Sequence, residues 1–595
     1  MRPIGSAPRT TTVAARVWRS GGPQWAPVWV ARAAFVVGLL GIVGAALPVA
    51  ARLDIVPLLI PPVAPAATRA VTIATGLLLL MLARGLRRRK RRAWLLAVVL
   101  TAAEAVLHLA RDLDLGQAIL TALLLALLVV TRAAFTGRPD PRSGRNTVVV
   151  FVTALLVAIG VGYGAILLDA DGITGTTSAG EVTEEVLLGL VGVPGPLAFD
   201  HARHADFVAI TLALLGAVVV LVTLAAALRP AGGPHGLSTE DEARLRALLA
   251  GPGPHDSLGY FALRREKSAI FSPTGKAAIG YRVIDGVSLA AGDPLGDPEA
   301  WPGVIEAWLD EARRYAWIPA VLAPSERGAA AYHRAGLDAL ELGDEAIVHT
   351  GEFTLKGRAM RGVRQAVGRA RRAGYTVDIT PAKALTEADL AEAQAASDRW
   401  REGTTERGFA MALGRLGDPD DTDCVLVRCR DADGALIALL SFVPWGSDGL
   451  SLDLMRRDPE SDNGIVELMV TDLLTTDQLP ALRRVSLNFA VFRSVFDRGA
   501  RLGAGPVLRL WRSLLLSASR FWQIESLYRA NAKYQPEWKP RYLCFVRSRD
   551  LPQVTIAALR AEAFLTAPAF WRRLRQGRRA PVQPDDPRIG QERGL

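Results

Sequence analysis

Arginines at helical spacing are the clearest candidates for binding chemistry in this sequence. In the helix-like run Gly357–Ala373, apolar residues gather on one side and arginines on the other. The apolar side holds Met360, Val363, Ala366, Val367 and Ala370; the opposite side holds Arg358, Arg361, Arg369 and Arg372, flanked by Arg364 and Arg371. Guanidinium groups bind phosphate oxygens in pairs, so an RNA backbone and a lipid phosphate both fit this surface. A solvated face is the alternative, but the scarcity of balancing carboxylates counts against it.

A second candidate pair lies in the strand-like run Leu450–Arg456. Leucines alternate there with other residues, so Asp453 should point away from the leucines, toward a cleft or the solvent. Arg456 has the opposite alternation, and the two side chains reach one site only if the strand ends or bulges there. Asp458 and Pro459 favour a strand end. An exposed ion pair at that end is the interpretation that the pattern alone favours.

The segment Ala530–Tyr542 interleaves aromatic residues with Lys533, Lys539 and Arg541. This mixture suits phosphate contact combined with stacking on bases. Aromatic residues that fill the edge of a core are an equally good interpretation. The formal net charge of +11 also favours anionic partners, although arginine-rich codon usage explains it equally well.

Other catalytic machinery is not visible in the sequence. There is no Walker A loop, dinucleotide fingerprint or HExxH motif, and no convincing Ser-His-Asp or Cys-His set. The three cysteines make neither a disulfide framework nor a metal-ligand set, and His201 with His204 lacks a third ligand. Gln365–Ala370 matches the pyrophosphate-binding pattern of acyl-CoA-dependent N-acetyltransferases too loosely to imply coenzyme A. No metal or cofactor is therefore expected.

The elements that would position these residues alternate between strands and helices after a helix start at Ser238 or Thr239. Strand-like runs are Lys276–Ile284, Ile318–Leu322, Cys424–Arg428, Ala435–Val443, Leu450–Met455 and Arg484–Phe489. Helix-like runs are Trp301–Tyr315, Gly357–Ala373, Thr386–Trp400, Ile465–Thr475 and Leu508–Tyr534. The mixture predicts an α/β region of two similar-sized units that meet near Thr380–Pro381.

The first part of the chain is apolar enough to predict a membrane domain. Six apolar stretches, at about 29–50, 67–83, 93–110, 115–134, 147–168 and 206–228, each have about the length that crosses a hydrocarbon core. Lys and Arg concentrate in the second and fourth loops and after the last stretch, whereas the fifth loop is acidic. Positive loops face the cytoplasm, so both termini are expected there. Glu104 and His108 share one face of the third stretch, as a functional pair or an interhelical contact.

Seven short motifs follow one another in the polar half: Ser257–Arg264, Gly292–Pro294, Phe353–Gly357, Glu406–Gly414, Asp453–Arg456, Ser486–Ala490 and Pro536–Tyr542. With these motifs, the region from about Asp256 to Val546 resembles the catalytic domain of the aminoacyl-phosphatidylglycerol synthases, the multiple-peptide-resistance-factor family. It is most similar to the actinobacterial branch, whose lysyl members often carry a fused lysyl-tRNA synthetase.

Together with the apolar stretches, the resemblance implies an α-helical transmembrane bundle of six spans followed by an α/β cytoplasmic region of two tandem acetyltransferase-like (GNAT) units. The expected division is a cytoplasmic N-terminal tail at 1–27, the transmembrane domain at 28–229, a first GNAT-like unit with the basic helix at 230–380, a second unit with the catalytic centre at 381–567 and a disordered tail at 568–595. The expected location is the cell membrane.

The resemblance implies transfer of an amino acid, with lysine favoured, from aminoacyl-tRNA to phosphatidylglycerol at the cytoplasmic membrane face. The product would reduce negative surface charge and aid resistance to cationic peptides. The tRNA ester is already activated, so the charged tRNA is a co-substrate and no cofactor is implied. Alanine, arginine and ornithine stay open as donors. The alternatives are a transferase of the same fold with another lipid acceptor, and a non-catalytic lipid-binding or flippase-like protein.

By resemblance, Asp453 and Arg456 form the catalytic centre. Asp453 would orient or deprotonate the lipid hydroxyl, and Arg456 would hold a phosphate or the ester carbonyl. Glu406 would accept the amino group of the aminoacyl moiety. The other implied substrate-binding residues are Glu467, Asn488, Lys533 and Arg541, the last two as phosphate ligands. The residues implied for tRNA or lipid phosphate are Arg358, Arg361, Arg364, Arg369 and Arg372.

The sequence departs from the family in two ways. Its six stretches fall short of the long forms whose extra helix bundle flips the product lipid, and it ends without a synthetase domain. Translocation is therefore in doubt, a separate aminoacyl-tRNA synthetase is an open partner, and the oligomeric state is not indicated.

Overall fold

The computed structural model describes residues 26–46, 66–110, 115–135, 137, 143–168, 173–174, 178–228, 232–234, 236–251, 255–401, 408–491 and 529–565. Glu406, most of the predicted helix Leu508–Tyr534 and nearly all of the two predicted tails lie outside these ranges. The side chains of Glu104 and His108 also lie outside what is described, so their predicted role stays a prediction.

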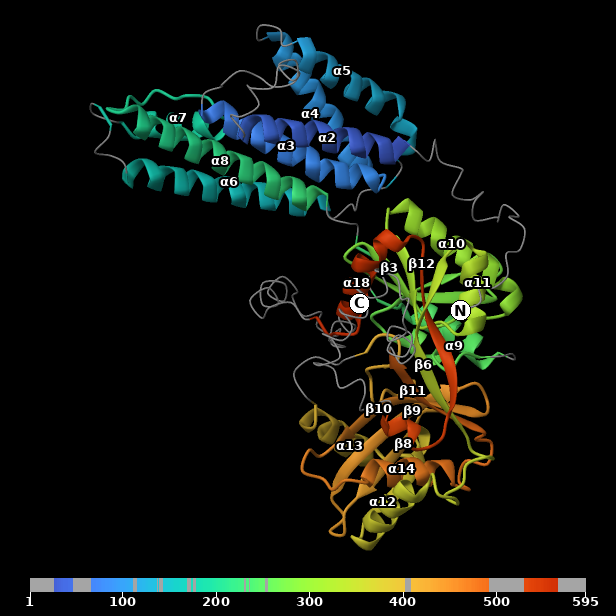
Figure 1. Ribbon diagram of the computed structural model, residues 1–595. Helices are drawn as coiled ribbons and strands as arrows, with labels where there is room; N and C mark the ends of the chain where they lie inside the picture. Colours follow the sequence, from blue (N-terminus) through green and yellow to red (C-terminus); the bar gives the residue numbers. More distant parts are fainter. Residues whose placement is uncertain are drawn as a thin grey trace, which may run out of the picture. The chain divides into compact units, whose positions relative to one another are not determined.

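Six long apolar helices occupy the N-terminal part of the chain (Figure 1). They are α2 (Ala26–Ala46), α3 (Ala66–Arg87), α4 (Arg91–Ala110), α5 (Leu115–Val130), α6 (Ser143–Leu168) and α8 (Ala202–Ala227). Their positions agree with the six apolar stretches of the sequence. Among the described residues, Asn146–Leu168 and Ala202–Ala227 are long and apolar enough to cross a membrane. The helical class is confirmed, and the number of spans stays a prediction.

A further helix, α7 (Ala179–Leu190), lies where the sequence predicts an acidic loop. Ser178 and Glu181 form a capping box at its start: the Ser178 hydroxyl accepts the Glu181 N–H, and the Glu181 carboxylate accepts the Ser178 N–H at 2.8 Å. Glu185 is buried and accepts the Leu197 N–H at 3.0 Å. The acidic run therefore starts and anchors a helix.

After Ser238 the chain is α/β, as predicted. Ser238 caps α9 (Thr239–Ala250) by accepting the Asp241 N–H at 3.1 Å. The first unit has the strand order β1-β2-β3-β5, with a short β4 beside β2. Its strands are β1 (Ser268–Phe271), β2 (Ala277–Ile284), β3 (Val287–Ala291), β4 (Leu295–Gly296) and β5 (Ile318–Leu322), and its further helices are α10 (Trp301–Arg314) and α11 (Glu326–Arg334). Trp308 and Tyr332 lie at the centre of its core.

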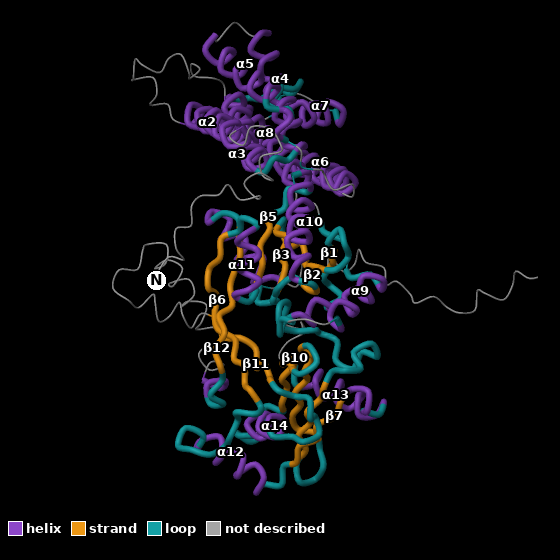
Figure 2. The backbone as a smooth tube through the Cα atoms, turned by 90° about the vertical axis from the view of Figure 1, so that its right-hand side faces the viewer, coloured by secondary structure: helices purple, strands orange, loops and turns teal. Residues whose placement is uncertain are grey.

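The second unit carries the strand order β6-β11-β10-β9-β8-β7. Figure 2 labels β6, β11, β10 and β7 of this sheet. The strands are β6 (Asp338–His349), β7 (Thr376–Pro381), β8 (Val425–Arg430), β9 (Leu436–Trp445), β10 (Gly449–Arg457) and β11 (Arg484–Val491). β10 and β11 are parallel and the other neighbours antiparallel. Helices α12 (Arg361–Arg372) and α14 (Ile465–Leu474) pack on one face, and α13 (Glu387–Arg399) packs on the other.

The boundary between the units differs from the sequence-based expectation. The compact units divide at Leu340/Glu341, and Thr380–Pro381 lies inside β7 of the second unit. The basic helix α12 therefore belongs to the second unit, because Val363 and Val367 on its apolar side join the core formed by β8, β9, β10 and α14. The second unit also includes Pro254–Arg264, from far earlier in the chain. The end of this unit contains most of β12 (Glu537–Phe545) and the helix α18 (Leu551–Ala561).

Candidate active site

A β-bulge in β10 decides where the two predicted catalytic residues point. Leu452 pairs with Phe442 of β9, and Leu454 pairs with the next residue, Ser441, so Asp453 is an extra residue without a partner in the ladder. Before the bulge, Leu452 faces α12 and α14. After it, Leu454 packs toward α13 instead. The bulge therefore reverses the alternation of the strand.

This reversal brings Asp453 and Arg456 to the same face of the sheet. Arg456 pairs across the ladder with Leu439, whose side chain belongs to the cluster beneath α13. Met455 and Arg457 take the opposite face and line a pocket. The sequence predicts that Asp453 and Arg456 reach one site only if the strand ends or bulges between them, and the structure has a bulge there.

Asp453 lies against an irregular segment, Gly408–Gly414. One oxygen of its carboxylate accepts the Leu413 N–H at 2.6 Å, and Arg264 donates to the Ala412 carbonyl oxygen at 2.9 Å. Burial, followed by the charges of Asp421 and Asp453, raises the pKa of the nearby Cys424 thiol. Cys424 is therefore protonated at neutral pH and is not a nucleophile. The carboxylate of Asp453 is held in one orientation by a backbone donor.

The two central strands form a fork beside Asp453. β10 and β11 pair only through Gly449/Arg484, Leu450/Val485 and Ser451/Ser486, although both strands continue. Past the last pair, Asn488 has a left-handed backbone (φ +67°) and donates its side-chain N–H to the Leu452 carbonyl at 2.8 Å. Its Oδ1 is buried without a hydrogen-bond partner among the described residues. Asn488 thus bridges the two strands where they separate.

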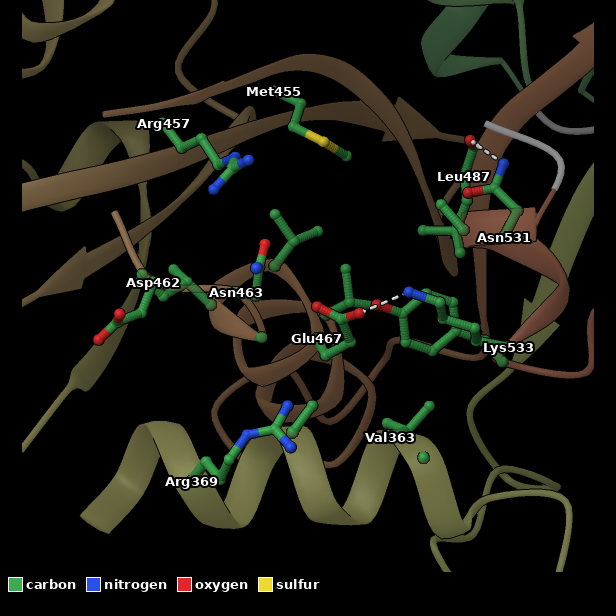
Figure 3. Close-up of a pocket in the computed structure, with 18 of the residues that line it drawn as sticks. Val363, Arg369, Met455, Arg457, Asp462, Asn463, Glu467, Leu487, Asn531 and Lys533 are labelled. Atoms are coloured by element: carbon green, nitrogen blue, oxygen red, sulfur yellow. Dashed lines mark hydrogen bonds and ion pairs between the residues drawn. The ribbon is translucent and has the colours of Figure 1, made fainter. Parts of the chain in front are cut away.

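A pocket of about 560 Å³ lies on the other face of this fork (Figure 3). Its walls come from α12, from Leu452 and Met455 of β10, from the start of α14 and from Leu487 of β11 together with the turn before β12. Its charged lining consists of Arg369, Arg457, Asp462, Glu467 and Lys533. The pocket accommodates a small ligand that carries both an ionic group and apolar surface.

One ion pair crosses the pocket. Lys533 Nζ lies 2.7 Å from Glu467 Oε1, as the dashed line in Figure 3 shows. The Glu467 side chain is 16% exposed and that of Lys533 is 48% exposed. Burial, and next the Glu467 charge, raise the pKa of the neighbouring Tyr534, which stays neutral. The site therefore already holds an ammonium against a carboxylate.

The arginine surface of α12 is exposed, as the helical pattern predicts. The apolar residues Val363, Ala366, Val367 and Ala370 are buried, whereas Arg361, Arg369 and Arg372 are exposed. Arg364 is exposed but donates to the Leu355 and Gly357 carbonyls, and Arg371 pairs with Asp472 at 2.6 Å. Arg358 precedes the helix, because Met360 is the N-cap and Gly357 has a positive φ of +93°. Arg369 links this surface to the pocket.

Arg541 lies in the interior, which speaks against its expected role as a phosphate ligand. Its side chain is 3% exposed and reaches Asp256 at 2.7 Å and Glu345 at 2.5 Å. Glu345 also accepts the hydroxyls of Ser257 and Ser486, each at 2.5 Å. The guanidinium is neutralised by two carboxylates and is almost out of contact with solvent.

The sequence-predicted residues thus lie in several different places around the fork. Asp453 and Arg456 lie on one face of the fork; Glu467, Lys533 and Arg369 line the pocket on the other. Asn488 bridges the strands, and Arg541 is buried behind them. Glu406 lies outside the described residues. Among the described residues, no group of three His, Cys, Asp or Glu side chains is placed to hold a metal.

Sequence reasoning missed Asp256, Glu345 and the Leu413 N–H. Ser257 begins the first family motif, directly after Asp256; Ser486 begins another and Arg541 belongs to a third. These motifs converge in the buried network around Glu345. The presence of all three motifs in one sequence was the available signal for such a network. Nothing in the sequence indicated which of their residues pair.

Family models match both the apolar helical region and the α/β region of the chain. The model of the family "Phosphatidylglycerol lysyltransferase, C-terminal" matches residues 246–545, half of the chain. The model "Transmembrane region of lysyl-tRNA synthetase" matches residues 23–228. The chain belongs to the phosphatidylglycerol lysyltransferase family, and the resemblance found in the sequence is confirmed.

Relatives with curated names agree with this family. The chain is 47% identical over 511 residues to the lysylphosphatidylglycerol biosynthesis bifunctional protein LysX of Rhodococcus opacus, covering 84% of this chain and 45% of that protein. The same-named protein of Mycobacterium avium is 46% identical, with 84% and 43% covered. The chain thus spans less than half the length of these relatives.

Two solved structures resemble the α/β region. L-PGS from Bacillus licheniformis is 23% identical, with a TM-score of 0.49, covering 56% of this chain and 99% of that one. The C-terminal domain of a putative lysylphosphatidylglycerol synthetase from Agrobacterium fabrum is 24% identical, with a TM-score of 0.46, covering 54% and 95%.

Proposed function

We propose that this chain transfers an amino acid, with lysine favoured, from charged tRNA to phosphatidylglycerol at the cytoplasmic face of the membrane. The observation that supports the proposal is the two-sided site at the fork. In this chain of the family, Asp453 and Arg456 lie on one face of the sheet, and a charged pocket lies on the other. Two substrates that meet at an opening between strands need such a two-sided site. The names of the curated relatives point to the same reaction.

The reaction is a transesterification at the fork. A glycerol hydroxyl oxygen of the lipid bonds to the ester carbonyl carbon, and its proton passes to the Asp453 carboxylate. The bond from that carbon to the tRNA ribose oxygen breaks, and the ribose oxygen takes the proton. Arg456 stabilises the negative charge that develops on the carbonyl oxygen. The Leu413 N–H holds Asp453 in the orientation that the transfer needs.

The pocket takes the aminoacyl end of the tRNA in this proposal. Glu467 already binds the Lys533 ammonium, so its carboxylate suits a cationic group of the donor. Lys533 and Arg369 supply positive charge for the terminal phosphates. Asn488 bridges the two strands at the fork, where the substrates meet. Arg541 acts behind the site by fixing Glu345.

The exposed arginines of α12 bind the tRNA backbone next to the pocket. Arg361 and Arg372 are exposed on the same helix as Arg369, which lines the pocket. Arg358 and Arg364 extend this basic surface at its N-terminal side. Lipid phosphate is the competing ligand for this surface, and the two differ in how binding responds to salt and to vesicles.

The chain is a multi-pass protein of the cell membrane, with six spans and both termini in the cytoplasm. This orientation rests on the Lys and Arg distribution of the loops and on the match of residues 23–228 to a transmembrane family model. The cytoplasmic region consists of two tandem acetyltransferase-like units, with the division at Leu340/Glu341. An aminoacyl-tRNA synthetase supplies the charged tRNA.

Mass spectrometry of total lipids tests the proposal, with cells expressing the wild type, Asp453→Asn or an empty vector. A phosphatidylglycerol species carrying one amino acid, present only with the wild type, establishes the reaction and names the donor. Equal membrane levels of the two proteins are the control. A new species on another lipid favours the other-acceptor alternative, and no new lipid with a matched tRNA supply favours a non-catalytic protein.

A further inference from the structure

The carboxylate of Glu562, directly after α18, is clamped to the segment that holds Asp453. The Phe409 N–H donates to one carboxylate oxygen at 2.7 Å, and the Ala410 N–H donates to the other at 3.0 Å. The Gly408 N–H also donates to the Glu562 backbone carbonyl at 3.3 Å. A residue near the end of the described chain therefore satisfies three successive backbone donors.

The segment between Gly408 and Leu413 depends on such partners. It contains no helix or strand, and yet Phe409 and Ala410 are fully buried. Gly408 has a φ of +109°, and a Cβ there would lie 2.4 Å from Ala412 Cβ, so this turn requires glycine. Side chains from outside the segment thus fix its path.

Three charged side chains bind this short segment at successive positions. Glu562 binds its start, Arg264 binds the Ala412 carbonyl at 2.9 Å, and Asp453 accepts the Leu413 N–H at 2.6 Å. Only Met411 and Ala412 separate the Glu562 clamp from the Asp453 contact. A shift at Phe409 is therefore transmitted directly to the donor that orients Asp453.

We propose that Glu562 is a positioning residue for the transfer reaction, acting through residues 409–413 on the Asp453 carboxylate. The inference rests on the proposed function, because it assigns Asp453 to the chemical step. Glu562 does not touch the substrate; it sets the position of the Leu413 N–H. Neutralising it leaves two buried N–H groups facing an amide that accepts only one of them.

The test compares Glu562→Gln with Asp550→Asn in the full-length protein, purified in detergent and supplied with lysyl-tRNA and phosphatidylglycerol. Asp550 is the matched control, since its carboxylate lies at the start of α18 and makes no capping bond there. We expect Glu562→Gln to lower kcat about ten-fold or more with KM values within about two-fold. Asp550→Asn should match the wild type.

Active-site titration by tRNA binding separates positioning from loss of folded protein, because kcat is then expressed per competent molecule. A kcat per competent molecule within about two-fold of wild type in Glu562→Gln overturns the proposal. Glu562→Asp keeps the charge on a shorter side chain, so its kcat should fall less than that of Glu562→Gln. If Glu562→Gln does not accumulate, the kcat of Glu562→Asp tests the proposal instead.

Leu413→Pro removes the N–H that Asp453 accepts and tests the same link from its other end. The double variant with Glu562→Gln should lose no more activity than Leu413→Pro alone, since both act through one contact. Additive losses overturn the link. Asp453→Asn reports on the proposed function separately: if it stays active, Asp453 is not the catalytic residue, whatever Glu562 does.

Discussion

Asp453 and Arg457 lie four residues apart on one strand and yet face opposite sides of the sheet. Regular alternation would place them on the same side, and the bulge at Asp453 separates them. Arg457 lines the pocket, whereas Asp453 binds the Leu413 N–H. One strand thereby contributes to both sides of the fork.

Removal of charge from α12 should weaken tRNA binding. With Arg361, Arg369 and Arg372 changed to Gln, we expect a lower affinity for tRNA and a shallower dependence of binding on salt, by about one unit of slope for each lost phosphate contact. The measurement is a titration of fluorescent tRNA at several salt concentrations. Arg371→Gln is the control, because Arg371 is already paired with Asp472.

A different outcome would reassign the α12 surface. If the triple variant keeps its tRNA affinity but loses binding to vesicles that contain phosphatidylglycerol, the arginines serve the membrane instead.

Loss of the pocket carboxylate should alter the choice of donor. Glu467→Gln removes a charged acceptor, so kcat/KM for lysyl-tRNA should fall about ten-fold or more, with a smaller fall for alanyl-tRNA. Parallel assays with the two charged tRNAs measure the ratio. Glu460→Gln, an exposed acid outside the pocket lining, should leave the ratio unchanged. Equal losses with both donors would exclude Glu467 from selecting a cation.

Breaking the buried network should destabilise the second unit. Arg541→Met leaves Glu345 and Asp256 buried without their cation, at a cost of about 3–5 kcal/mol. Thermal unfolding of the purified protein measures the loss. Lys539→Met, on the same strand but half exposed, should have little effect. A phosphate-binding role for Arg541 would instead lower activity without changing the unfolding temperature.

Acid should remove a contribution of Asp389 to stability. Its hydrogen bond from Thr386, followed by that from Arg428, lowers the pKa of Asp389 from its usual value near 3.8 to about 2. A carboxyl with a depressed folded-state pKa stabilises the fold above its unfolded pKa, and this contribution fades as pH falls from about 4 to about 2. Unfolding at several pH values should show a smaller acid dependence in Asp389→Asn. An unchanged pH dependence would contradict the shift.

Local patterns in the sequence were enough to predict most strands and helices of the α/β region. Ile318–Leu322 is a strand with the predicted bounds, because polar segments flank a short apolar run. The helix predicted from Gly357 begins at Arg361 instead, since Gly357 adopts a positive φ. The apolar helices of the N-terminal part were predictable from length and composition alone.

Long-range pairing was beyond the sequence. Arg541 and Glu345 are 196 residues apart, so nothing near Arg541 indicated that it would be buried. The boundary near Thr380–Pro381 was wrong because α12 packs on strands that follow it in the sequence. Asp453 could be singled out by alternation, but the side of the sheet that Arg456 takes depends on the extra residue, which leaves no local signal.

The buried network also orders events during synthesis. Asp256 and Ser257 leave the ribosome long before Arg541, and Glu345 stays without its cation until β12 has been made. Until then Arg541 is missing from the buried network behind the fork. The Gly408–Gly414 segment also lacks the Glu562 carboxylate that accepts its backbone N–H groups. The nascent second unit therefore cannot fold completely before nearly all of its sequence has emerged. A chain cut between α14 and β12 should be degraded by proteases and should not keep partial activity.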